Sequence, residues 1–162
     1  VKLNPSFAIA YNNLGSAKKK NNDIKGAIED YTFAIKLKPD YFIAYDNRGS
    51  ARFELGDYAG AIEDYTETIK LNSEYALAYN NRGNAYLKNA NTDLAKATPD
   101  FQKALADYDK AIKLNPSYGY AYYNRGIIKE LLRQQKAACA DWAKAAELGI
   151  NNAAEIIKTE CK

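Results

Sequence analysis

The sequence predicts an all-α protein, a solenoid of four antiparallel helix pairs followed by one further helix. Three observations predict it: a pattern of residues that recurs with a period of 34, apolar residues spaced as on one face of a helix, and motifs that stop helices. An apolar fraction of 47% supplies side chains for a core. No stretch approaches the roughly 18 apolar residues of a spanning helix, so we expect no membrane insertion.

Glycine and aromatic residues mark the repeating unit. Gly15, Gly49, Gly83 and Gly126 are separated by 34, 34 and 43 residues, and each follows a tyrosine by four residues. Later in each unit an alanine is followed four residues on by a large aromatic residue: Tyr31, Tyr65, Tyr108 and Trp142. Small residues let paired helices approach closely, and a single pair cannot bury its apolar face, so neighbouring pairs must stack.

The first unit contains "YNNLG", "AIEDY" and "KLKPD". With a period of 34, these segments resemble the tetratricopeptide repeat (TPR) family over residues 1 to about 150. The resemblance implies a right-handed superhelical solenoid of TPR-type antiparallel helix pairs in a single array over 1–162. Its repeats are expected at 8–41, 42–75, 76–118 and 119–152.

The third unit carries nine extra residues, which we place near 89–97, between its two helices. Thr98 followed by Pro99 predicts a helix start there, because threonine caps helices and proline is favoured at the first helical position. We expect the insertion to be a tolerated surface bulge, in which "TDLAKA" could add a turn of helix, with a recognition loop as the alternative.

Both ends of the sequence have partial repeat features. "VKLNP" at 1–5 matches the second-helix end "AIKLNP", so we expect it to be the remnant of a preceding repeat. Residues 153–162 predict a capping helix with Ala153, Ile156 and Ile157 on its inner side. The run "KAAELGINNAA" also resembles the helix ends of Sel1-like repeats.

Composition argues against an enzyme. The chain has no histidine and no phosphate-binding or dinucleotide-type glycine motif, so we expect no catalytic residue, cofactor or small-molecule substrate. Two cysteines without histidine are a poor ligand set, so no metal site is expected. A net charge of +3 does not favour nucleic acid. Lys18, Lys19 and Lys20 form the best basic patch, and RNA binding is kept as a second alternative function.

Cys139 and Cys161 lie on the last repeat helix and on the capping helix. They could form a disulfide across neighbouring helices, or remain two small buried thiols. The compartment is unknown: the cytoplasm is favoured unless the two cysteines are bridged, in which case export is favoured.

Arginine stands in three repeats at a position where the family most often has leucine. These residues are Arg48, Arg82 and Arg125, whereas the first repeat has Leu14. An arginine packed on apolar surface needs an acidic partner for its head. An aspartate precedes the second-helix aromatic in every repeat, and we expect these to be the structural partners: Asp30, Asp64, Asp107 and Asp141.

Asparagines recur on one face of the first helices. The sixth position is always asparagine, at Asn13, Asn47, Asn81 and Asn124, and it shares a face with the second, fifth, ninth and thirteenth positions. In TPR proteins this face lines the concave groove. We therefore expect peptide-binding residues here: Asn12, Asn13, Asn47, Asn80, Asn81, Asn84, Tyr120, Tyr123 and Asn124. Hydrogen bonding between helices is the alternative role for the asparagines.

The row resembles the asparagine ladder of O-linked N-acetylglucosamine transferases, and partly the carboxylate clamp of chaperone-binding TPR domains. The lysines of the clamp are replaced here by Asn12, Asp46 and Asn80 at one place and by Leu77 and Tyr120 at the other. The predicted function is a protein-interaction scaffold that binds a protein or peptide segment in the groove. The first alternative is a structural array that self-associates.

Overall fold

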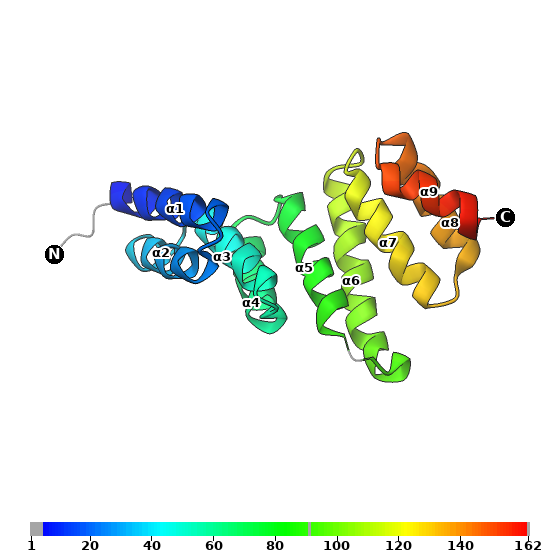
Figure 1. Cartoon of the computed structure of the whole chain (residues 1–162), viewed down its shortest axis with the longest axis horizontal. Helices are drawn as coiled ribbons and strands as arrows, with labels where there is room; N and C mark the ends of the chain where they lie inside the picture. The colour runs from blue at the N-terminus through cyan, green and yellow to red at the C-terminus, as the bar shows by residue number, and fades with distance from the viewer. Residues whose placement is uncertain (1–4, 91, 162) are drawn as a thin grey trace. The chain divides into compact units, whose positions relative to one another are not determined.

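The computed structural model describes residues 5–90 and 92–161 of the 162-residue chain, and these residues form nine α-helices and no strand (Figure 1). The helices fall into two compact units, of which unit 1 ends at Glu74 and unit 2 begins at Tyr75. The predicted all-α helical-repeat class is confirmed. Of the segment 1–5 expected to be a repeat remnant, residues 1–4 lie outside the described residues, and Pro5 begins the first helix.

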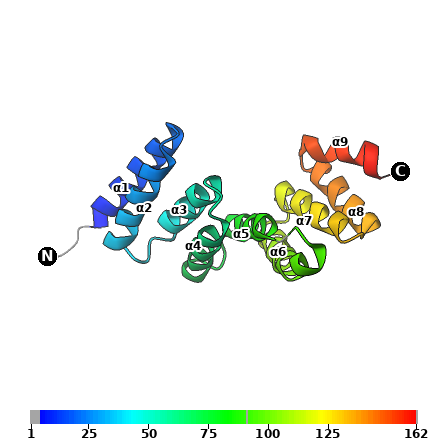
Figure 2. The same ribbon diagram turned by 60° about the horizontal axis from the view of Figure 1, so that its bottom comes forward.

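Unit 1 consists of two helix pairs, α1 (Pro5–Lys20) with α2 (Ile24–Leu37) and α3 (Phe42–Glu54) with α4 (Tyr58–Leu71). In each pair the two helices lie side by side (Figure 2). An aspartate caps each second helix: the Asp23 side chain accepts a hydrogen bond from the Gly26 N–H at 3.0 Å, and Asp57 accepts from Gly60 at 2.9 Å. These bonds satisfy N–H groups that a helix start leaves without partners.

Unit 2 contains α5 (Ala76–Asn89), α6 (Leu94–Leu114), α7 (Gly119–Leu131), α8 (Gln135–Glu147) and α9 (Asn151–Glu160). Helix α5 pairs with α6 and α7 pairs with α8, and α9 packs on α8. Helices α6 and α7 also contact each other, so consecutive pairs within the unit share a core.

Helix α6 begins four residues earlier than Thr98, so the predicted cap at Thr98 is wrong. The cap is Asp93, whose side chain accepts from the Ala95 N–H at 3.0 Å, and Pro99 lies inside the helix. The reason is burial: Ala97, in the added turn, is fully buried and packs in one cluster with Phe101. Part of the insertion therefore extends a core helix, and only a short connection is left between α5 and α6.

The repeated glycines stand where an aromatic ring fills the space between paired helices. A β-carbon on Gly83 would lie 2.7 Å from Cε1 of Tyr108, and one on Gly126 would lie 2.5 Å from Nε1 of Trp142. Real side chains do not approach so closely, so the ring on one helix requires glycine on the other. Both rings are fully buried.

The last core cluster lies under α9. Ala138, Trp142 and Ala145 of α8 are fully buried together with Ala153 of α9. Ile156 and Ile157 pack against this cluster, as the sequence predicts for the inner side of the capping helix. A disulfide joins Cys139 to Cys161 at the end of α9, which is the bridged one of the two predicted alternatives.

Candidate functional site

Each of the three arginines pairs with the aspartate of its own repeat. The guanidinium of Arg48 donates to both carboxylate oxygens of Asp64, at 3.0 and 2.7 Å. Arg82 donates to Asp107 through two bonds of 2.8 Å, and Arg125 donates to Asp141 at 2.8 and 2.5 Å. Such two-point contacts are the strong form of the arginine–carboxylate pair.

A second cation, one helical turn after the arginine, joins two of these three pairs. Arg52 lies 3.0 Å from Asp64, and Lys129 lies 2.7 Å from Asp141. In the first repeat, where Leu14 replaces arginine, Lys18 pairs with Asp30 at 2.7 Å. Sequence reasoning missed these cations, although their spacing of four residues from the arginine position is a helical one.

Burial and pairing act on the protonation of these groups. The hydrogen bonds from Arg125 to Asp141 and Asp109 raise the pKa of Arg125, and the hydrogen bond to Asp30 raises the pKa of Lys18. Asp107 has a single bonded cation among the described residues, and here burial outweighs the partner and raises the pKa of Asp107. The buried carboxylate of the third repeat therefore has one bonded cation fewer than those of the second and fourth repeats.

Two of the predicted peptide-binding residues, Asn12 and Asn80, are buried and accept hydrogen bonds from the next repeat. The Asn47 side-chain amide donates to Oδ1 of Asn12 at 2.9 Å, and Asn124 donates to Oδ1 of Asn80 at 3.1 Å. These bonds connect α1 with α3 and α5 with α7. Asn12 and Asn80 thus face the protein interior, whereas Asn47 and Asn124 remain partly at the surface.

Asn84 also takes part in the packing of its own repeat. The Tyr108 hydroxyl donates to Oδ1 of Asn84 at 2.7 Å. The matching hydroxyl of Ser16 lies 3.2 Å from that of Tyr31 in the first repeat. In the fourth repeat the aromatic residue is Trp142, whose ring N–H donates to the main-chain oxygen of Tyr123 at 3.2 Å.

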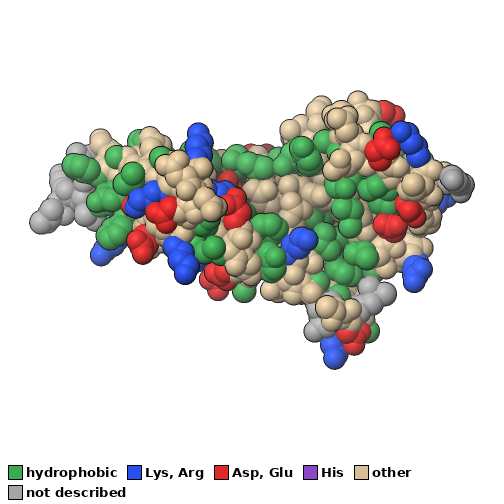
Figure 3. Space-filling model, in the orientation of Figure 1, with side chains coloured by type: hydrophobic (Ala, Val, Ile, Leu, Met, Phe, Trp, Pro, Cys, Tyr) green, Lys and Arg blue, Asp and Glu red, His purple; other side chains and the backbone are tan. Residues whose placement is uncertain are grey.

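An exposed row is left on the first helices of each unit. Every second-position residue is apolar and exposed, from 37% for Leu77 to 58% for Tyr120. Four residues further on, on the same side of the helix, stands the sixth-position asparagine. Hydrophobic side chains reach the surface in several places on both units (Figure 3). The row consists of Ile9, Asn13, Ile43 and Asn47 in unit 1 and of Leu77, Asn81, Tyr120 and Asn124 in unit 2.

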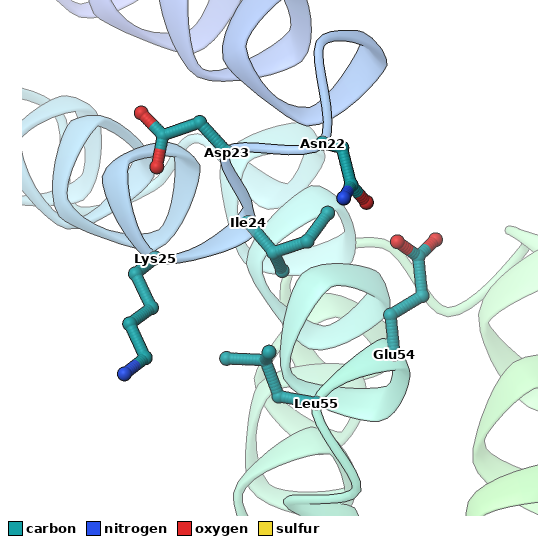
Figure 4. Close-up of a pocket in the computed structure, with 6 residues that line it drawn as sticks. All are labelled: Asn22, Asp23, Ile24, Lys25, Glu54 and Leu55. Carbon is teal, nitrogen blue, oxygen red and sulfur yellow. The ribbon is translucent and has the colours of Figure 1, made fainter.

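Unit 1 has two hollows, one of which includes a residue of this row. One, of about 340 Å³, is lined by Ser16, Lys19, Lys20, Tyr31, Asn47 and Glu54, and thus includes a row asparagine. The other, of about 580 Å³, lies where the α1–α2 turn meets the end of α3 (Figure 4). It is lined by Asn22, Asp23, Ile24, Lys25, Glu54 and Leu55, none of which was predicted to bind a ligand.

The basic patch on α1 is largely neutralised by its neighbours. Lys18 pairs with Asp30, and Lys19 pairs with Glu54 at 2.7 Å and donates to the Ser50 hydroxyl at 2.7 Å. Across the described part of the chain no cluster of acidic or cysteine side chains is placed to hold a metal ion, and none of its helices has the length and hydropathy to cross a bilayer.

The paired helices, their glycine contacts and the repeated ion pairs define an all-α helical-repeat protein. A family model described as "TPR repeat" matches residues 49–89 and 100–132, and one described as "Tetratricopeptide repeat" matches residues 8–41. The chain belongs to the tetratricopeptide repeat family. The matches stop at residue 132, so the Sel1-like resemblance of the C-terminal end stays a prediction.

Solved structures with this fold include MamA, with 26% identity and a TM-score of 0.78 over 93% of this chain and 82% of that chain. The first TPR of Spaghetti (RPAP3), bound to the HSP90 peptide SRMEEVD, has 26% identity and a TM-score of 0.73 over 82% and 98%. A thermophilic TPR protein of Thermus thermophilus, TTC0263, with 21% identity, a TM-score of 0.77 and coverage of 88% and 74%, shows the fold alone. No curated protein matches the chain. TPR proteins act as protein-interaction scaffolds.

Proposed function

We propose that this chain binds a peptide or protein segment on the exposed faces of its first helices. One observation carries the proposal: in all four repeats an exposed apolar residue is followed, on the same side of the helix, by asparagine. Exposed apolar residues scattered singly need no explanation, but a position that is apolar and exposed in every repeat indicates a contact surface.

The row has the chemistry of a peptide contact. An asparagine side chain offers one acceptor oxygen and two N–H donors, so it can match the C=O and N–H of a peptide unit. After their bonds to Asn12 and Asn80, Asn47 and Asn124 each retain the oxygen and one N–H for a ligand. The neighbouring apolar residues would supply burial, at about 25 cal/mol per Å².

We do not propose an acidic peptide such as the HSP90 peptide of the RPAP3 neighbour as the ligand of this chain. That peptide has two adjacent glutamates and a final aspartate, and carboxylates are bound most strongly by arginine and lysine side chains. Here Asp46, Asn12 and Asn80 occupy one of the clamp positions, and Lys19 is already paired with Glu54. We therefore propose a partner segment that is recognised through apolar side chains and main chain.

The experiment starts with the full chain as bait, and mass spectrometry identifies the captured protein. Binding of its segment is then titrated against Ile9→Ser with Ile43→Ser, and against Leu77→Ser with Tyr120→Ser. The pair that lies in the unit that binds the segment should weaken binding about tenfold or more, because two side chains that the segment would bury are lost. The matched control is Lys36→Ala with Lys113→Ala, two residues of second helices that lie outside the row.

A further variant tests the asparagines. Asn13→Ala with Asn81→Ala keeps the bonds that Asn47 and Asn124 donate and removes only the long bond of 3.5 Å from the Asn80 amide to Asn81, so helicity should be unchanged. Each lost ligand hydrogen bond costs about 0.5–1.5 kcal/mol, so binding should weaken several-fold. If all three row variants bind the segment as tightly as the parent, the row is not the binding surface.

Self-association is the second candidate, because the outer face of the first repeat is apolar. Phe7, Leu14 and Phe33 are exposed, and Tyr11 stacks on Phe33 with ring centroids 5.5 Å apart. The matching positions in the other repeats hold tyrosine, arginine and charged residues, respectively. Light scattering tests this candidate: a mass that stays monomeric over a hundredfold range of concentration removes it.

A further inference from the structure

Helix α9 is fastened to α8 at both ends. At its start, the Ile150 N–H donates to the main-chain oxygen of Ala145 at 3.0 Å. At its end, Cys161 is bonded to Cys139 of α8. Beside this bridge, the Gln135 amide donates to the main-chain oxygen of Glu160 at 2.5 Å and lies 4.0 Å from the Cys139 sulfur.

Helix α9 covers a face that in unit 1 is covered by the next repeat. There the buried Ala27 and Tyr31 of α2 pack with Ala51 of α3. The matching residues of α8, Ala138 and Trp142, instead pack with Ala153 of α9. Helix α9 thus takes the place of a following first helix and keeps an apolar face of α8 from water.

Without the disulfide, the contacts that keep α9 packed on α8 are weak. It has ten residues, and isolated helices shorter than about 12–15 residues are marginal in water. Its N-cap, Ile150, makes no side-chain capping bond. Of its apolar anchors only Ala153 is fully buried, whereas Ile156 and Ile157 are partly exposed, and the outer side of the helix is polar. Helix α9 therefore keeps its shape only while it is docked.

We propose that the Cys139–Cys161 disulfide is a redox latch that holds α9 on α8, and that its reduction releases α9 and exposes the apolar face around Trp142. A dithiol thiolate attacks one sulfur, which breaks the S–S bond and forms a mixed disulfide. The second dithiol sulfur then displaces the remaining cysteine and closes its own disulfide. Two electrons and two protons pass to Cys139 and Cys161, both of which are partly exposed.

The test compares the full chain before and after treatment with a dithiol. Amide hydrogen exchange in 151–160 should become about tenfold faster or more on reduction, while exchange in α5 to α7 stays unchanged. Trp142 is the only tryptophan of the chain, so acrylamide quenching of its fluorescence should rise in parallel. Removal of the dithiol and reoxidation should restore both values. Cys139→Ser with Cys161→Ser should behave as the reduced parent and should not respond to the dithiol.

Three results would overturn the latch. The first is exchange in α9 that stays as slow after reduction as before, which would mean that packing alone holds it. The second is exchange in α7 and α8 that rises together with that of α9, which would make the bridge a general stabiliser of unit 2. The third is two free thiols titrated in unfolded, non-reduced protein, which would mean that the bridge does not form. A failure of the segment-binding variants leaves these readouts unchanged, because none of them uses a ligand.

Discussion

Replacing Arg82 by leucine should destabilise the protein far more than the same change at Arg125, although both residues hold the same position of consecutive repeats. Each arginine makes a two-point contact with a buried aspartate of its own repeat. The difference lies one turn further along the helix. Lys129 follows Arg125 and lies 2.7 Å from Asp141, whereas the matching residue after Arg82 is Tyr86, which cannot replace a cation.

The expected loss of unfolding free energy in each variant follows from the cations that its aspartate keeps. In Arg125→Leu, Asp141 keeps Lys129 and loses the guanidinium bonds, which costs about 1–2 kcal/mol. In Arg82→Leu, Asp107 keeps no bonded cation among the described residues, and an uncompensated buried charge costs about 3–5 kcal/mol. A difference of about 2–3 kcal/mol corresponds to roughly 4–12 °C in melting temperature for a chain of this size.

Protonation gives a second readout of the same variants. Burial already raises the pKa of Asp107, and loss of Arg82 would raise it further. A carboxyl whose pKa is raised by folding stabilises the fold when protonated and loses that contribution as the pH rises through the folded value. The loss of unfolding free energy that Arg82→Leu causes, relative to the parent, should therefore be larger at pH 8 than at pH 5. Urea and thermal unfolding followed by circular dichroism measure both effects. Equal losses for the two leucine variants would refute the role given to Lys129.

Other changes test the local backbone and the buried hydroxyls. Arg133 has a φ of 60°, where Gly56 stands at the matching position with a φ of 81°. Because a side chain in this region costs about 1–2 kcal/mol, Arg133→Gly should raise the urea midpoint, and a lower midpoint would contradict this account. Burial raises the pKa of Tyr108, so its neutral hydroxyl stabilises the fold fully below the ordinary tyrosine value of about 10 and this contribution is lost at higher pH. Between pH 8 and pH 11 the parent should lose more stability than Tyr108→Phe, and parallel losses would argue against the assignment.

The repeated helix pair was predictable because its packing requires glycine and a large aromatic residue at constant spacing in the sequence. A ring at Tyr108 or Trp142 leaves no room for a β-carbon at Gly83 or Gly126, so small and large residues must alternate between paired helices. The α6 start was not predictable from the same local rules. Thr98 and Pro99 have the chemistry of a helix start, but Asp93 offers another cap, and burial of Ala97 favours the longer helix. Whether Ala97 becomes buried depends on residues of other helices.

The second cations show a different limit. Arg52 and Lys129 follow the paired arginines by four residues, and this spacing is present in the sequence. Lys18 stands at the same spacing after Leu14, and it pairs with Asp30 where no arginine is available. The cation that pairs with the buried aspartate can therefore stand at the arginine position or four residues after it, and one of the two is enough. A search for a single recurring cation position finds the arginines and misses Arg52, Lys129 and Lys18.

The asparagines separate into two groups that the sequence alone could not distinguish, because one residue type serves both. The fifth-position residues Asn12 and Asn80 are buried and accept hydrogen bonds from the sixth-position residues of the next repeat. A buried amide oxygen that lost its donor would cost about 1–3 kcal/mol, so these bonds also fix the spacing of the first helices. In the proposed binding mode a ligand meets the sixth-position amides, of which Asn47 and Asn124 each already donate one hydrogen bond within the protein. Similar amides give little discrimination between peptides, so in this mode selectivity comes from the apolar residues beside them. Those residues differ along the chain, from Ile9 and Ile43 in unit 1 to Leu77 and Tyr120 in unit 2. Exchanging Tyr120 for isoleucine should thus change which segment is preferred, whereas exchanging one asparagine should change mainly how tightly any segment is held.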